Sequence, residues 1–92
     1  MDFKKAAILG SYISKDYAES LFRLLVTYQS ISASEAASRL DLHIKTVQDF
    51  LEAMSELGIL TKEEVAEKKR PYFRYTLKTR KIKMEIDLSR LF

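Results

Sequence analysis

Residues 31–60 contain two helical patterns with room for only a tight turn between them, and this arrangement constrains the fold more than any other feature. Ser32 and Glu35 have the S-x-x-E spacing of a capping box. In that motif the hydroxyl accepts from the amide of Glu35, and the carboxylate accepts from the amide of Ser32. The turn begins at Asp41, and Gly58 supplies the left-handed residue that commonly ends a helix. We therefore predict a short helix, a turn and a longer helix that stops at Gly58.

Apolar residues in this region recur at intervals of three and four, as on one face of an amphipathic helix. In order along the chain they are Ala36, Ala37, Leu40, Ile44, Val47, Phe50, Leu51, Met54 and Leu57. The two alanines are small enough to let crossing helices approach closely. His43 directly precedes the second helix, where it either caps the helix or donates to a phosphate.

A further helix is predicted upstream, over residues 15–28, where apolar residues again repeat at helical spacing. Ser14 is the expected cap of this helix. Before it, residues 3–8 have the composition of a short extra helix, which we expect Gly10 and Ser11 to break. This N-terminal segment is either a fourth helix of the domain or a dimerisation element.

After Gly58 the apolar period changes from that of a helix to that of a strand. Residues 59–65 and 72–77 are predicted to be the arms of a β-hairpin whose loop is closed by Pro71. Residues 81–88 alternate apolar and charged side chains, which predicts a strand with one buried face. This strand either joins the hairpin as a third strand or pairs across a dimer. The predicted fold class is therefore α+β.

Three stretches of the chain carry a family likeness, namely SEAASRL, VQDFLEAMSELGIL and KKRPYFRYTL. They resemble the winged helix-turn-helix family, in the broad group of small archaeal and bacterial regulators that includes the ArsR and MarR groups. The resemblance covers about residues 14–78. It implies a homodimer with its second helix in the major groove of DNA and its hairpin, the wing, on the backbone. The chain is then one domain over residues 1–92, with an N-terminal extension (1–13), a helical core (14–60), the wing (61–78) and a C-terminal strand or arm (79–92).

The residue types that most catalytic and metal sites need are scarce. There are no cysteines, one histidine and two glycines, so thiolate metal sites, multi-histidine metal sites and glycine-rich phosphate loops are excluded. We therefore expect no enzymatic activity, no cofactor and no metal. Apolar runs are far shorter than the ~20 residues that cross a bilayer, and no signal-peptide pattern is present. We expect a cytoplasmic protein with no membrane partner.

Positive charge is concentrated late in the sequence. Residues 62–83 hold nine Lys and Arg against three Glu, whereas residues 1–61 hold six Lys and Arg against eight Asp and Glu. A local excess of cations is the electrostatic footprint of a polyanion partner, although a solvated charged surface has the same composition. Together with the resemblance, this asymmetry favours double-stranded DNA as the partner.

The second helix and the wing are the predicted DNA-binding elements of a sequence-specific transcriptional regulator. The N-terminal residues of a recognition helix reach base edges, where Gln48 would bind adenine and Thr46 a phosphate or a thymine methyl group. Cations at the wing would follow the backbone or enter the minor groove. The predicted DNA-binding residues are His43, Lys45, Thr46, Gln48, Asp49, Lys68, Lys69, Arg70 and Arg74.

An alternative function is open on the same residues, namely a winged-helix module for protein–protein contact in a larger assembly. Asp49, Glu52 and Glu56 favour it, because carboxylates on the second helix repel phosphates. With either function we expect a homodimer, because the apolar side chains of residues 3–8 and 82–92 would otherwise leave large exposed patches.

Overall fold

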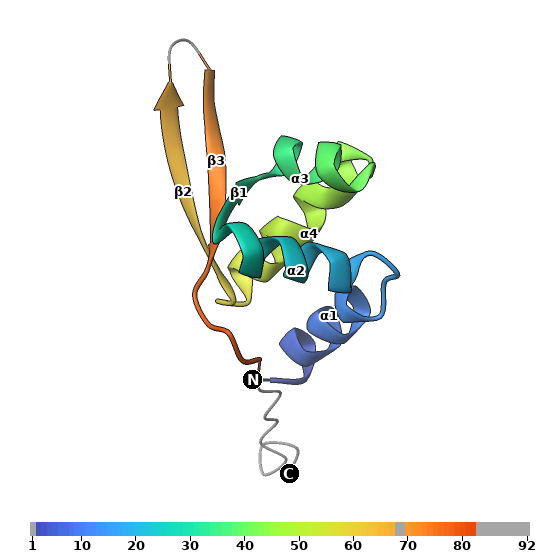
Figure 1. Ribbon diagram of the computed structural model, residues 1–92. Coiled ribbons are helices and arrows are strands. Elements are labelled where there is room, and N and C mark those ends of the chain that lie inside the picture. The colour runs from blue at the N-terminus through green and yellow to red at the C-terminus, as the bar shows by residue number, and fades with distance from the viewer. Residues whose placement is uncertain (1, 68–69, 83–92) are drawn as a thin grey trace.

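The computed structural model describes residues 2–67 and 70–82. Within those ranges the chain is α+β, with four helices and one three-stranded antiparallel sheet of order β1-β3-β2 (Figure 1). The elements in chain order are α1 (Phe3–Ile13), α2 (Ala18–Tyr28), β1 (Ser30–Ser32), α3 (Ala33–Leu40), α4 (Ile44–Glu56), β2 (Leu60–Glu67) and β3 (Arg70–Leu77). The predicted fold class is thus confirmed, and the arrangement is compatible with that of a winged helix.

The pair α3–α4 forms as its sequence predicts, with one change in the capping box. The Ser32 hydroxyl accepts from the backbone amide of Glu35 at 3.2 Å. The Glu35 carboxylate, however, accepts from the Ser32 hydroxyl at 3.3 Å and from Arg74 at 2.7 Å, rather than from the Ser32 amide. The reason is that Ser32 is also the last residue of β1, where it pairs with Arg74 of β3.

The α3–α4 turn and the ends of α4 lie where the sequence predicts them. Asp41 adopts φ 54°, the left-handed conformation, and the amide of Leu42 bonds the carbonyl of Ala37 at 2.9 Å. Nδ1 of His43 accepts from the amide of Lys45 at 3.2 Å, which caps α4. Gly58 has φ +80°, where a side chain would be strained. The second helix is therefore fixed at both ends by local bonds.

The N-terminal helix is longer than predicted. It runs from Phe3 to Ile13, so Gly10 and Ser11 lie inside it, and Asp2 caps it by accepting from the amide of Lys5 at 2.8 Å. Burial of apolar side chains on this helix outweighs the weak helix propensity of Gly10. The prediction that Ser14 caps the next helix is wrong, because Ser14 ends α1 and its hydroxyl donates to the carbonyl of Ser11 at 2.9 Å.

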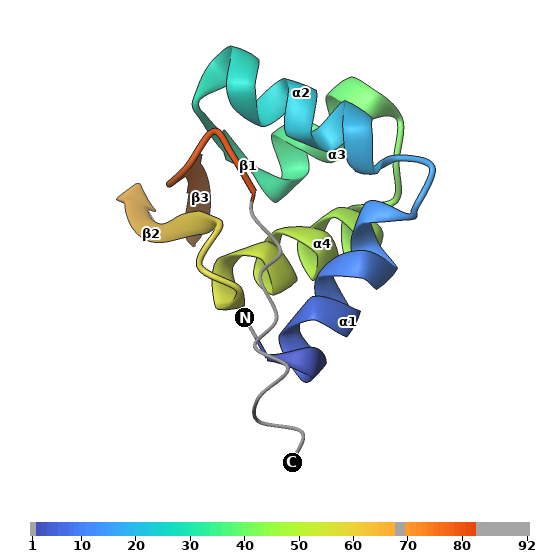
Figure 2. The same cartoon turned by 90° about the horizontal axis from the view of Figure 1, so that it is seen from below.

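The core lies where α1, α2, α3 and α4 meet the sheet. Figure 2 shows α1 alongside α4, with α2 and α3 on the other side of α4. The fully buried side chains of largest volume come from α1, α2, α4 and β1, whereas α3 contributes the small buried Ala36 and Ala37. The large ones are Phe50, Leu9, Leu21, Leu25, Ile31, Leu51, Met54 and Val47. The N-terminal extension is therefore part of the hydrophobic core, because α1 contributes Leu9 to it.

The third strand of the described sheet comes from a segment before α3, whereas the sequence offered residues 81–88 as either a third strand or an arm that pairs across a dimer. The observed strand is β1, a three-residue strand that pairs antiparallel with β3 through Ile31 opposite Tyr75. Both of these side chains are buried. Of the predicted strand over residues 81–88, Lys81 and Ile82 are described and are not in a strand, and the remainder lies outside the described residues. No helix within the described ranges is both long enough and apolar enough to cross a membrane.

The place of α1 in the core generates a stability prediction. Leu9 is 0% exposed and its neighbour Ile8 is 36% exposed. Replacing Leu9 with alanine should lower the free energy of unfolding by about 2–5 kcal/mol, because it removes buried methyl groups and leaves a cavity. Chemical denaturation followed by circular dichroism measures this change. Ile8→Ala is the matched control and should cost much less; equal losses would show that α1 does not pack as described.

Candidate nucleic-acid interface

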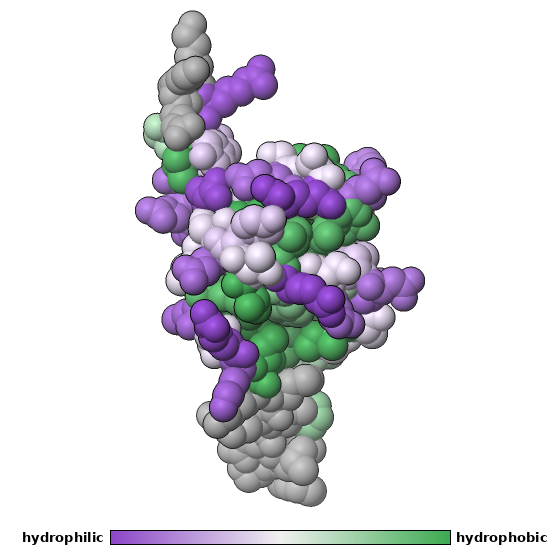
Figure 3. Space-filling view, viewed as in Figure 1, coloured by the Kyte–Doolittle hydropathy of each residue, from purple (hydrophilic) through white to green (hydrophobic). Residues whose placement is uncertain are grey.

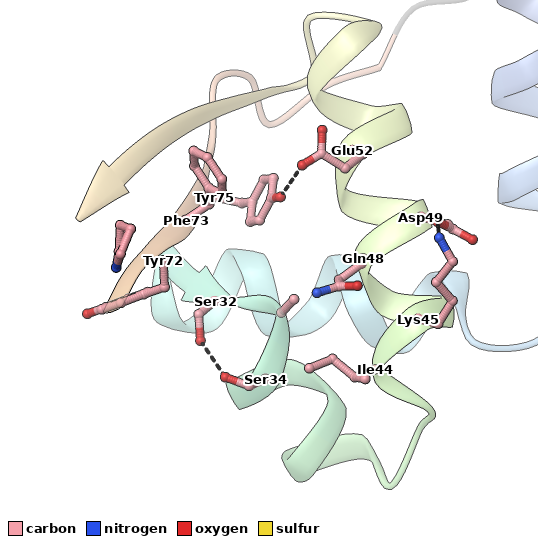
Figure 4. A pocket seen from close by; sticks show the side chains of 12 residues that line it. Ser32, Ser34, Ile44, Lys45, Gln48, Asp49, Glu52, Tyr72, Phe73 and Tyr75 are labelled. Atoms are coloured by element: carbon pink, nitrogen blue, oxygen red, sulfur yellow. Dashed lines mark hydrogen bonds and ion pairs between the residues drawn. The ribbon is translucent and has the colours of Figure 1, made fainter. Parts of the chain in front are cut away.

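A groove of about 430 Å³ separates the exposed side of α4 from the hairpin (Figure 4). Four segments line it: the end of β1, the start of α3, the first two-thirds of α4, and β3. The lining residues are Ser32, Ala33, Ser34, Ile44, Lys45, Gln48, Asp49, Glu52, Pro71, Tyr72, Phe73 and Tyr75. We call this feature the α4–hairpin groove. It brings the predicted recognition helix and the predicted wing to opposite walls of one concave surface.

Four side chains near the start of α4 project in two directions. Figure 4 shows Ile44 and Gln48 on the side of α4 that faces α3 and the hairpin, and Lys45 with Asp49 on the other side. The Lys45 ammonium lies 3.1 Å from a carboxylate oxygen of Asp49. Residues four positions apart on a helix are neighbours, which explains why Ile44 and Gln48 share one side of α4 and Lys45 and Asp49 the other.

Glu52 connects α4 to both long strands of the sheet. Its Oε1 accepts from the hydroxyl of Tyr75 at 2.6 Å and lies 2.6 Å from Nζ of Lys62. The hydrogen bond from Lys62, followed by that from Tyr75, lowers the pKa of the Glu52 carboxyl group below its ordinary value. Burial, followed by the bond to Glu52, raises the pKa of the Tyr75 phenol. These two bonds fix the hairpin against α4.

The acidic residues of α4 are therefore less repulsive to an anion than their number implies. Asp49 and Glu52 each have a lysine within 3.1 Å. Because each carboxylate is next to an ammonium group, the two pairs are neutral when viewed from a distance. On the side of the molecule seen in Figure 1, where α2 lies in front of α4, Figure 3 shows hydrophilic residues interspersed with apolar ones rather than gathered in one field.

The structure places the predicted DNA-binding residues of α4 in three different settings. Lys45, Gln48 and Asp49 line the α4–hairpin groove. His43 is exposed and has the capping role that was its alternative. Thr46 is half-buried and does not line the groove, because it lies on the flank of α4 away from Ile44.

The predicted wing residues also differ in their settings. Arg70 is exposed at the start of β3. Lys68 and Lys69 lie outside the described residues. Arg74 has internal partners instead of a free guanidinium group. It donates to Oε1 of Glu35 at 2.7 Å, to Oγ of Ser30 at 2.9 Å and to the carbonyl of Ser30 at 3.0 Å. Arg74 thus joins β3 with β1 and the first turn of α3, and its contact with DNA stays a prediction.

The basic residues after β3 lie away from the groove. Lys78, Arg80 and Lys81 are exposed and follow the end of β3 that is opposite to Arg70 (Figure 1). Because a strand rises ~3.3 Å per residue, the seven steps from Arg70 to Leu77 separate the two ends of β3 by roughly 23 Å. The cationic stretch that looks continuous in the sequence is thus split between two ends of the sheet.

Two exposed apolar residues, Ile44 and Phe73, are among the groove residues that the sequence did not single out as site residues. Alternation along β3 puts Phe73 on the same face as the buried Tyr75, but Phe73 is 42% exposed because the hairpin extends beyond the helices. The ammonium of Lys62 lies 4.0 Å from the centre of the Phe73 ring, a cation–π contact. Ile44 is 43% exposed. Its position at the edge of the apolar stripe of α4 was the available signal, since edge positions can face either the core or the solvent.

The described chain thus has the form of a small α+β domain with a groove between a helix and a hairpin. It belongs to the HVO_A0114 family, whose model matches residues 18–77. The matched range begins at the first residue of α2 and ends at the last residue of β3, so it includes every residue that lines the groove. A search of curated proteins finds no match to this chain.

The bonds to Glu52 generate a prediction for the pH dependence of stability. Because its pKa is lower in the folded chain than in the unfolded chain, Glu52 adds stability above pH 4.5, its ordinary pKa. That stability is lost as the pH falls through the folded pKa. The melting temperature of Glu52→Gln should therefore be below that of the wild type near neutral pH, and the difference should narrow below pH about 4.5.

Thermal unfolding followed by circular dichroism between about pH 7 and about pH 3 measures this difference. Glu63→Gln is the matched control, because Glu63 is an exposed glutamate that directly follows Lys62 in β2. Its melting temperature should follow that of the wild type throughout. A constant gap between Glu52→Gln and the wild type over the whole range would contradict the assignment.

Proposed function

We propose that the protein is a winged helix-turn-helix transcriptional regulator that binds double-stranded DNA in the cytoplasm. In this proposal α4 enters the major groove and the hairpin is the wing on the adjacent backbone. The observation that carries it is the α4–hairpin groove, whose walls are the exposed start of α4 and the outer part of β3. The role is one of binding, with no catalytic step, metal or cofactor.

The dimensions of α4 agree with this proposal. An α-helix with its side chains is ~10–12 Å wide, and the major groove of B-DNA is ~12 Å wide. The start of α4 is the end that a recognition helix presents to base edges. There Gln48 offers an amide and Lys45 a cation, and both line the groove.

The affinity must come largely from the hairpin tip. Lys45 and Lys62 already have carboxylate partners, and Arg74 is bound to Glu35. Arg70 is exposed at the tip end of β3, and the sequence adds Lys68 and Lys69 next to it. Cations at this position follow the phosphate backbone and supply affinity that does not depend on sequence.

A protein-contact module is the second candidate function. The observation in its favour is that Ile44 and Phe73, on opposite walls of the groove, are 43% and 42% exposed. Exposed apolar side chains across a concave surface are also suited to a protein partner. The two functions differ in their dependence on salt, because only DNA binding releases condensed counterions.

Titration of labelled generic duplex DNA at two salt concentrations tests the proposal. A DNA-binding dimer with about six phosphate contacts should lose roughly three decades of affinity between about 50 and about 200 mM salt. Replacing Lys68, Lys69 and Arg70 together with alanine should weaken binding to all duplexes alike. It should also flatten the salt slope by about 0.9 for each phosphate that the variant no longer neutralises. Absence of duplex binding by the wild type at the lower salt concentration would refute DNA binding and favour the protein-contact module.

The chain itself offers a matched control for the triple variant. Replacing Lys78, Arg80 and Lys81 with alanine removes the same charge from exposed positions at the other end of β3. If only the total charge mattered, the two triple variants would bind equally weakly. The proposal requires that the tip variant lose more affinity than the control.

We also propose that the regulator is a homodimer. Part of the apolar surface that motivated this expectation is used inside the monomer, since Ala6 and Leu9 are buried. Phe3, Ile8 and Ile82 remain 47%, 36% and 37% exposed. A two-fold axis would cover them, and binding to a palindromic site requires that it place the two copies of α4 ~34 Å apart.

Analytical ultracentrifugation at micromolar concentration measures the oligomeric state. The expected mass is twice that of the 10.7 kDa chain. Phe3→Ser should shift the population toward monomer, because it places a polar group in the apolar contact. A monomer at every concentration would exclude the homodimer.

A further inference from the structure

Ile44 is a large apolar residue that the core does not use. It begins α4 and is 43% exposed, whereas Val47, less than one turn further on, is 0% exposed. Its side chain lines the α4–hairpin groove beside Ser34 of α3. Singly exposed apolar residues are common on protein surfaces. This one, however, occupies the first turn of the proposed recognition helix, where base edges would lie.

Gln48 lies one helical turn beyond Ile44 and on the same side of α4 (Figure 4). Lys45, Asp49 and Glu52, the other polar residues of α4 in the groove, each have an ion-pair partner. Gln48 forms no side-chain hydrogen bond with any residue in the described ranges, and it is exposed. Its amide is therefore available to a ligand without the loss of an internal bond.

The major groove of DNA offers a partner for each of these side chains. The C5-methyl group of thymine is the apolar group that a base edge presents there, and adenine presents the N7 acceptor and N6 donor that a glutamine amide binds in a bidentate way. We propose that Ile44 contacts a thymine methyl group beside an adenine bound by Gln48, so that the preferred half-site of this protein contains A·T pairs at this place. This inference rests on the proposed function and adds the identity of the bases.

The spacing of the two side chains limits the arrangement of those pairs. Four residues along a helix rise by ~6 Å, and successive base pairs in B-DNA are ~3.4 Å apart. The thymine and the adenine therefore belong to base pairs one or two steps apart. Lys45 and Asp49 project from the other side of α4, so they do not come between Ile44 and Gln48.

Deoxyuridine substitution tests the methyl contact directly, because uracil lacks the methyl group and pairs as thymine does. A duplex selected by the full-length protein from a random pool would be prepared with each thymine replaced singly. At one position per half-site, uracil should weaken wild-type binding about fourfold, the value of one buried methyl group. Ile44→Ala should bind the unmodified duplex about as weakly as the wild type binds the uracil duplex. It should show no further loss with uracil.

Two control variants separate this contact from general effects. Val26→Ala removes an apolar residue that is 48% exposed on α2, outside the groove, and should keep both the affinity and the uracil effect. Gln48→Ala should lose discrimination at the neighbouring A·T pair and keep the uracil effect. Equal binding of thymine and uracil duplexes at every position, or a uracil effect that persists in Ile44→Ala, would overturn the inference alone. Absence of salt-dependent binding to any duplex would overturn the proposed function and this inference with it.

Discussion

Phe50 is the contact on which the arrangement of the helices depends. It is fully buried, and its ring lies edge-to-face with those of Tyr12, Tyr17 and Phe22, at centroid distances of 5.8, 6.0 and 5.3 Å. Tyr12 belongs to α1, whereas Tyr17 is the N-cap of α2 and Phe22 lies within α2. One residue of α4 therefore sets the positions of α1 and α2. Aromatic pairs of this geometry add about 0.5–1.5 kcal/mol each beyond burial, so the cluster is a substantial part of the stability of a small domain. The exposed side of α4 points to the groove because Phe50 holds the opposite side in the core.

Much of the fold could be predicted because its determinants are local. The capping bond of Ser32, the left-handed Gly58 and the change to a two-residue period each depend on residues a few positions apart. The missed strand, β1, has only three residues, and it forms because β3 offers an edge to pair with. The length of α1 also depends on distant contacts, since Leu9 packs into a core made largely of residues after Ala18. No pattern within either segment contains that information.

The candidate site was predictable in its location and less so in its details. The helix period placed Lys45, Gln48 and Asp49 opposite the core side of α4, and all three line the groove. The sequence could not reveal that Arg74 would bind Glu35, because these residues are 39 positions apart and meet only through the pairing of β1 with β3. The exposure of Phe73 was hidden for a related reason. Alternation along a strand assigns side chains to two faces, but it does not say how far the helices extend along either face.

The ion pairs on the groove have a consequence for selectivity in a DNA-binding protein of the proposed kind. Lys45 and Lys62 already have Asp49 and Glu52 as internal counterions. When a lysine moves from such a carboxylate to a phosphate, it exchanges one anionic partner for another. Fewer counterions are then released to the solvent than when a solvated lysine binds the phosphate. A duplex that the protein contacts only through phosphates therefore gains little binding free energy from these two lysines. The carboxylates therefore compete with the DNA backbone and leave the choice among sequences to the side chains that can touch bases.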